Sequence, residues 1–114
     1  MEYTIYHNPR CTKSRQGLAL LQEKGVKTEV REYLKELPTT KELKDLLSKL
    51  GMSAEELMRK GEKDYKEQVK EKDLNEDEKI ERMIAFPKLI ERPIVIKGNK
   101  AVVGRPTEKI LELF

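Results

Sequence analysis

The spacing of the apolar residues changes twice along this sequence, and that change most constrains the fold. Near both ends, apolar residues form short runs rich in β-branched and aromatic side chains: Tyr3–Tyr6, Ile94–Ile96 and Ala101–Val103. Between these runs they recur every three or four residues. Runs of the first kind are typical of buried strands, and spacing of the second kind is typical of amphipathic helices. The sequence therefore predicts an α/β domain whose strands come from both ends of the chain.

The first third of the chain predicts a strand, a helix and a second strand. A helix is expected from Thr12 to Lys24, with Gly25 as the residue that ends it. Thr28–Tyr33 is a weaker strand in which charges alternate, a pattern that an edge strand tolerates. Such a βαβ unit is expected to be right-handed, with its two strands parallel.

A helical block follows, and we expect it to span about residues 39–86. Thr39 with Glu42, and Ser53 with Glu56, have the spacing of capping boxes that begin helices. Asn75 begins a further helix that Pro87 breaks. The segment 62–79 is almost entirely charged and is interpreted as a solvated face or a mobile loop-helix segment.

The last third predicts two strands and a helix. Gly98-Asn99 separates two apolar runs and suits a tight hairpin turn. A final helix is expected after Pro106, with Ile110, Leu111 and Phe114 facing inward. The order is βαβ, a helical insertion and ββα, which predicts a mixed sheet with flanking helices in a single domain, 1–114.

Composition excludes several classes of function. Lysine and arginine number 24 against 21 aspartate and glutamate, and because the two signs alternate, we expect no nucleic-acid partner. No apolar run approaches the ~18 residues that span a membrane, and the N-terminal residues lack a signal-peptide pattern, so we expect a cytoplasmic protein with no membrane partner. One cysteine forbids an internal disulfide, and with a single histidine we expect no metal site.

The only cysteine, Cys11, lies where the first strand passes into the first helix. Unpaired backbone N–H groups and the helix dipole favour a negative charge there, which lowers a thiol pKa and also attracts an oxyanion. Arg10, Lys13 and Arg15 add positive charge. The alternative is a small buried hydrophobic residue, but this polar and cationic run is poorly suited to a core. We favour a reactive thiol with a pKa below the ~8.5 of a free thiol.

Other side chains are candidates for supporting roles. Arg92 and Arg105 each precede a proline at a strand border, and a guanidinium fork matches a tetrahedral oxyanion, although each alone is more typical of a surface ion pair. His7 is either a structural residue, which we favour slightly, or a hydrogen-bond partner of the loop. Ser14 either donates to the thiolate or caps the first helical turn.

These residues resemble the glutaredoxin-coupled arsenate reductase family, ArsC, within the thioredoxin-like superfamily that also contains the Spx regulators. The resemblance rests on four segments that occur in the family's order along the whole chain. They are Ile5–Pro9 with Cys11, Ser14 and Arg15; Met58–Lys60; Arg92–Val95; and Gly104–Pro106.

The resemblance implies a thioredoxin-like fold and a thiol-dependent oxidoreductase that needs no bound cofactor. Cys11 attacks arsenate, while Arg59, Arg92 and Arg105 bind the oxyanion and its reduced product. Pro93 is the cis-proline, and His7 and Ser14 tune the thiolate. Glutathione, followed by glutaredoxin, resolves the adduct as an external thiol, and the protein is expected to be a monomer.

Two sequence departures keep other functions open. Cys11-Thr12-Lys13-Ser14 stands where arsenate reductases often read Cys-Gly-Thr-Ser, and the chain stops at Phe114 where they commonly continue. One alternative is an ArsC-like monothiol oxidoreductase acting on another substrate, such as glutathione mixed disulfides. The other is an Spx-like regulator that binds RNA polymerase, although Spx proteins usually carry a second cysteine where this chain has Ser14.

Overall fold

The computed structural model describes residues 2–114, which divide into two compact units. The sheet unit comprises residues 2–36 and 92–114, and the helical unit comprises residues 37–91. The helical insertion predicted at about 39–86 falls within the helical unit. That the whole chain acts as one domain stays a prediction.

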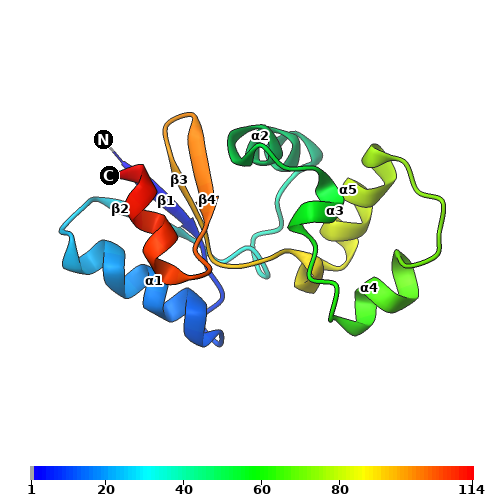
Figure 1. The fold of residues 1–114 in the computed structure, drawn as a ribbon, viewed down its shortest axis with the longest axis horizontal. Coiled ribbons are helices and arrows are strands. Elements are labelled where there is room, and N and C mark those ends of the chain that lie inside the picture. Colours follow the sequence, from blue (N-terminus) through cyan, green and yellow to red (C-terminus); the bar gives the residue numbers. More distant parts are fainter. Residues whose placement is uncertain (1) are drawn as a thin grey trace. The chain divides into compact units, whose positions relative to one another are not determined.

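The sheet unit contains a four-stranded mixed sheet in the order β2-β1-β3-β4 (Figure 1). Its strands are β1 (Tyr3–Tyr6), β2 (Thr28–Arg31), β3 (Ile94–Lys97) and β4 (Lys100–Val103). β1 runs parallel to β2 and antiparallel to β3, and β3 and β4 form the hairpin predicted around Gly98-Asn99. β2 lies at the edge, as predicted, but ends at Arg31 because the chain turns from Glu32 onward. The α/β mixed sheet is confirmed.

Two helices pack on this sheet through a common core. α1 (Thr12–Glu23) contributes Leu21, and the 3-10 helix η2 (Thr107–Leu113) contributes Ile110 and Leu113. These side chains meet the buried residues of the strands, Tyr3, Ile5 and Val95. Figure 1 shows α1 and η2 beside each other in this unit. The position of α1, and therefore of the loop before it, is fixed by this core.

The inward face predicted for the final helix was partly wrong. Leu111 is 42% exposed and Phe114 is 50% exposed, whereas Leu113 is buried beside Ile110. The reason is that the segment forms a 3-10 helix with three residues per turn, so positions 110 and 113 share a face. Phe114 stacks on Tyr3 instead, with ring centroids 5.1 Å apart.

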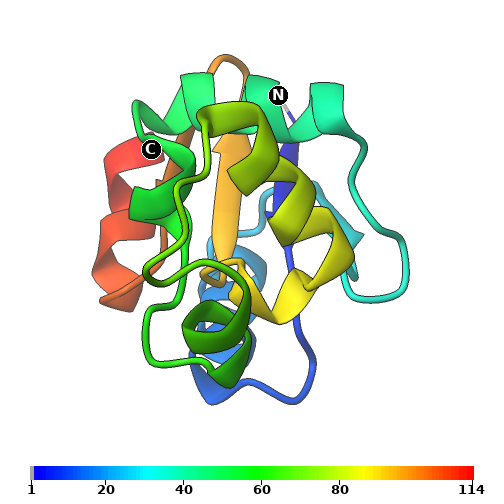
Figure 2. The ribbon, with the colours of Figure 1, turned by 90° about the vertical axis from the view of Figure 1, so that its right-hand side faces the viewer.

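The helical unit is built from short helices, shown in Figure 2 in green to yellow. They are α2 (Thr40–Leu50), α3 (Ala54–Leu57), α4 (Lys63–Gln68), α5 (Glu76–Ala85) and η1 (Pro87–Leu89). The capping boxes at Thr39 and Ser53 are both present, and Asn75 begins α5 with a third. The charged segment 62–79 therefore includes α4, and Val69 after it is buried. Local polar signals fix where these helices begin.

Candidate active site

Cys11 is the N-cap residue of α1, at the end of the loop that leaves β1. The loop is held by its own backbone: the Cys11 N–H donates to the Asn8 carbonyl at 3.0 Å, and the Cys11 carbonyl accepts from the Arg15 N–H at 3.0 Å. The Arg10 N–H donates to the side-chain oxygen of Asn8 at 3.0 Å. The thiol therefore sits on a defined turn at a helix N-terminus, as the sequence predicts.

The pKa of the Cys11 thiol lies below its usual value, although the strongest single influence opposes this. Burial raises the pKa, since the residue is only 9% exposed. The backbone N–H of Ser14, the Arg92 guanidinium and the backbone N–H of Lys13 together outweigh burial and lower the pKa, because each stabilises the thiolate. Cys11 is thus buried, and donors and cations lie around its sulfur.

Two arginines that are distant in the sequence converge on this sulfur. A terminal nitrogen of Arg105 lies 3.6 Å from Cys11 Sγ, across 94 positions of the chain. The Nε of Arg105 donates to the Arg92 carbonyl at 2.8 Å, which fixes the direction of the guanidinium. The Arg92 guanidinium is also near enough to the thiol to lower its pKa. The structure therefore brings together three of the four predicted catalytic residues.

Pro93, the residue after Arg92, is packed between two glycines. The Arg92–Pro93 peptide bond is cis, as the resemblance implies. A Cβ added at Gly17 or at Gly104 would lie 3.0 Å from Pro93 Cγ. Glycine at both positions therefore lets α1 and the segment after β4 approach the proline closely. We did not predict these glycines; the signal was a glycine in mid-helix at position 17, which costs ~1 kcal/mol relative to alanine unless packing requires it.

His7 and Ser14 form a buried pair beneath the loop. The Ser14 hydroxyl lies 2.6 Å from His7 Nδ1 and accepts the Asn8 N–H at 2.9 Å. Burial lowers the pKa of His7, the Arg15 charge lowers it further, and the Glu32 carboxylate raises it. The Ser14 side chain thus orients His7 and the loop, whereas its backbone N–H acts on Cys11.

Arg15 closes the loop from outside. Its guanidinium donates to the Pro9 carbonyl at 2.9 Å and to the Thr12 hydroxyl at 3.2 Å. Both bonds hold the chain on either side of Cys11. Arg15 therefore acts on the shape of the loop as well as on its charge.

Arg59, the fourth predicted catalytic residue, belongs to the helical unit, where it pairs with two carboxylates. One guanidinium nitrogen lies 3.2 Å from a Glu62 carboxylate oxygen, and its Nε lies 3.5 Å from a Glu91 carboxylate oxygen. Its backbone N–H donates to the Leu89 carbonyl at 2.7 Å. These contacts fix the side chain within its own unit, and its part in oxyanion binding stays a prediction.

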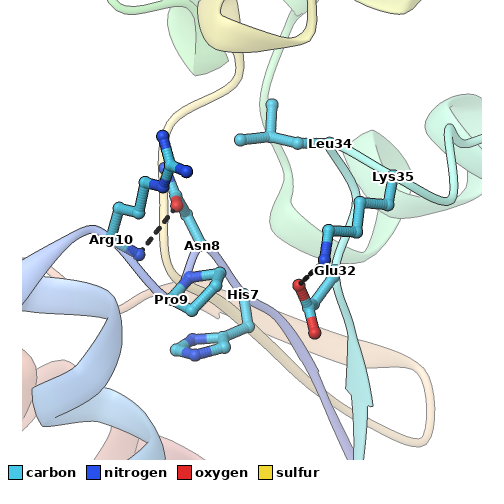
Figure 3. Close-up of a pocket in the computed structure, with 7 residues that line it drawn as sticks. All are labelled: His7, Asn8, Pro9, Arg10, Glu32, Leu34 and Lys35. Carbon is cyan, nitrogen blue, oxygen red and sulfur yellow. Dashed lines mark hydrogen bonds and ion pairs between the residues drawn. The ribbon is translucent and has the colours of Figure 1, made fainter.

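A cavity of about 220 Å³ opens on the sheet unit beside the loop (Figure 3). It is lined by residues that follow β1 and by residues that follow β2: His7, Asn8, Pro9, Arg10, Glu32, Leu34 and Lys35. We did not predict the part contributed after β2. The signal was topological, because the carboxyl ends of parallel strands meet at one edge of a sheet, where ligands commonly bind.

Neither a metal-binding cluster nor a membrane-spanning helix occurs among residues 2–114. Within that range, no group of three or more His, Cys, Asp or Glu side chains is arranged to hold a metal ion. Over the same range, no helix has both the length and the apolar character to cross a bilayer.

The chain is similar to known proteins along nearly its whole length. The model of the ArsC family matches residues 6–113. The uncharacterized protein YfgD of Escherichia coli (strain K12) is 51% identical, over 96% of this chain and 93% of that protein. An arsenate reductase of Neisseria meningitidis serogroup B (strain MC58) is 46% identical, over 96% of this chain and 95% of that protein.

Solved structures of similar proteins have the same fold as this chain. The structure of an arsenate reductase from Vibrio cholerae superposes with a TM-score of 0.96 at 43% identity, covering 100% of this chain and 98% of that one. A protein related to the ArsC family from Bacteroides fragilis superposes with a TM-score of 0.85 at 24% identity over the full length of both chains. The predicted thioredoxin-like fold is confirmed.

Proposed function

Because this chain belongs to the ArsC family, we propose that it reduces arsenate to arsenite, with external thiols as the reductant. The observation that carries the proposal is the approach of Arg105 to the Cys11 sulfur at 3.6 Å, on a helix N-terminus. A thiolate nucleophile and an oxyanion are both negative, so they repel each other when they approach. Donors and cations around one point in space overcome this repulsion.

Cys11 acts as the nucleophile. Its thiolate forms a sulfur–arsenic bond while one oxygen of arsenate leaves as water, which gives a covalent adduct. Over the complete reaction, two thiols become one disulfide and give up two electrons to arsenic. Arsenic acid and two thiols thus yield arsenous acid, the disulfide and one water, and Cys11 is returned as a thiol. The lowered pKa of Cys11 supports this role, because the thiolate is the reactive form.

The arginines offset the charge of the oxyanion. Arg105 is already aimed at the sulfur by its bond to the Arg92 carbonyl, and Arg92 contributes its own guanidinium to the thiol. Arg59 completes the set in this proposal, although Glu62 and Glu91 hold its guanidinium in the present arrangement. A planar fork can donate two parallel bonds to a tetrahedral oxyanion, which an ammonium group cannot.

The reductant must come from outside the chain. Cys11 is the only cysteine, so no second thiol of this protein can resolve the adduct. We propose glutathione as the first thiol and glutaredoxin as the protein that completes the reduction, acting on a monomer in the cytoplasm. A reducing compartment supplies such thiols and keeps Cys11 reduced.

The test is arsenite production with glutathione and glutaredoxin. Cys11→Ser should abolish it, and Arg105→Gln should lower kcat by about 10²-fold, the cost of removing one oxyanion donor. Arg82→Lys is the matched control. Arg82 lies on α5 of the helical unit, and its Nε donates to the carbonyl of Gln68 on α4. This variant should retain wild-type turnover.

Two outcomes would decide against the proposal. Full arsenate-dependent oxidation of glutathione by Cys11→Ser would show that the thiol is not the nucleophile. If the wild-type protein reduced glutathione mixed disulfides, and Arg105→Gln did so equally well while neither formed arsenite, the monothiol oxidoreductase alternative would stand instead.

A further inference from the structure

The cavity beside the loop is not used by the chemistry proposed above. It lies at the carboxyl ends of the parallel strands β1 and β2, where the His7 N–H donates to the Arg31 carbonyl at 2.8 Å. Its volume of about 220 Å³ exceeds the ~150 Å³ of an engineered cavity that binds benzene. A group the size of an amino acid therefore fits it.

Charges of both signs line this cavity on different sides. Figure 3 shows Arg10 on one side and the Glu32–Lys35 pair on the other. The Arg10 side chain forms no ion pair with any of the residues 2–114 and is exposed. Glu32 and Lys35 lie 3.6 Å apart with exposed fractions of 39% and 79%, so water already screens their attraction. A ligand can compete for both groups at small cost.

The walls between these charges are apolar. Pro9 contributes its ring from the loop, and Leu34 contributes its side chain from the turn after β2 (Figure 3). A ligand that matches the whole surface thus has a short aliphatic part, a negative end and a positive end. A simple oxyanion matches only the cations of this surface, because it offers no positive group to the Glu32 carboxylate.

We propose that this cavity binds the free amino-acid end of a small peptide thiol. The chemistry that fits is an α-amino group and an α-carboxylate on one carbon, joined to the thiol through a side-chain amide, as in glutathione. In this arrangement the carboxylate faces Arg10, the ammonium faces Glu32, and the aliphatic part contacts Pro9 and Leu34. This identity rests on the proposed function, which requires an external thiol.

The position of the cavity suits such a reductant. Arg10 both lines the cavity and precedes Cys11 in the chain, so a ligand held by Arg10 lies beside the loop that presents the sulfur. An extended peptide spans about 3.5 Å per residue. A tripeptide thiol held at Arg10 is therefore longer than the single step along the loop from Arg10 to Cys11. The cavity would thus anchor the thiol without occupying the site of the oxyanion.

Binding can be measured apart from catalysis with S-methylglutathione, whose capped sulfur cannot react. Calorimetric titration of the wild-type protein should show binding with a Kd near ~1 mM. Glu32→Gln and Arg10→Gln should each raise Kd by about tenfold, because each removes one charge-assisted bond. Glu29→Gln is the matched control: Glu29 is an exposed carboxylate on β2 outside the cavity, and its variant should keep the wild-type Kd.

Three results would overturn the inference. One is an absence of binding up to about 10 mM, at which a ~1 mM site is nearly saturated. Another is an equal rise in the Kd for S-methylglutathione in Glu29→Gln and in Glu32→Gln. The third is equal affinity for S-methyl-N-acetylcysteine, which lacks the free amino group. Arsenite production with dithiothreitol separates this failure from failure of the proposed function, since dithiothreitol supplies the electrons without needing the cavity.

Discussion

The Ser14 hydroxyl joins two parts of the loop to α1, and removing it tests how the loop is held. In Ser14→Ala the oxygen that lies 2.6 Å from His7 Nδ1 and accepts the Asn8 N–H at 2.9 Å is lost. Ser14 is fully buried and His7 is 6% exposed, so water does not readily replace the lost partner of His7. Asn8 is half-buried, so its N–H is partly rehydrated.

The expected cost follows from these burials. A buried polar group left without its partner costs about 1–3 kcal/mol, and we assign the upper part of that range to His7 and the lower part to Asn8. Alanine recovers about 0.5 kcal/mol because it is the better helix former in the first turn of α1. The free energy of unfolding should therefore fall by about 2.5–4.5 kcal/mol.

Urea unfolding followed by circular dichroism measures this change. Ser48→Ala is the matched control, because Ser48 is exposed on α2 and its substitution should change stability by less than about 0.5 kcal/mol. If Ser14→Ala also fell within that range, the hydroxyl would not be holding the loop, and the account of the buried pair would be refuted.

Two further predictions concern the thiol and its support. The rate of Cys11 alkylation should rise with pH to a midpoint below ~8.5, because its thiol pKa is lowered. The free energy of unfolding of the wild-type protein, relative to that of Cys11→Ser, should rise between the folded-state pKa of Cys11 and ~8.5. The reason is that a lowered thiol pKa stabilises the folded state only at a pH where the thiolate exists. A midpoint at or above ~8.5 would contradict the first. Gly17→Ala should destabilise the protein, since its Cβ would meet Pro93 Cγ at 3.0 Å and overpacking costs about 1–3 kcal/mol against ~1 kcal/mol gained in helix propensity. Gly61→Ala, where an added Cβ meets nothing within 4 Å, should not lower the melting temperature.

The local elements were largely predictable because their signals are local. A hydroxyl or amide followed three residues later by glutamate closes a capping box within one helical turn, and all three examples begin helices at the expected residues. The Gly98-Asn99 turn likewise needs only its own backbone, since Gly98 adopts a φ of +61°. No distant contact is required for any of these choices.

The final helix shows where such reasoning fails. Its apolar residues fit an α-helical face, but the chain forms a 3-10 helix that buries Leu113 and leaves Leu111 exposed. The choice depends on the surface offered by β1, β3 and α1, against which Ile110 and Leu113 pack. Packing against a preformed core outweighed the local preference.

The sequence by itself determined that one thiol stands at a helix N-terminus in a cationic loop, because strand, proline, cysteine and helix follow one another within ten residues. Only the tertiary structure decided that Arg105, 94 positions away, reaches the sulfur, and that the turns after β1 and β2 enclose a cavity. The physical reason is that helix starts and turns depend on neighbours along the chain. The approach of residues that are distant in the sequence depends instead on the order of the strands in the sheet. That order is set by burying the apolar faces of the strands and helices together.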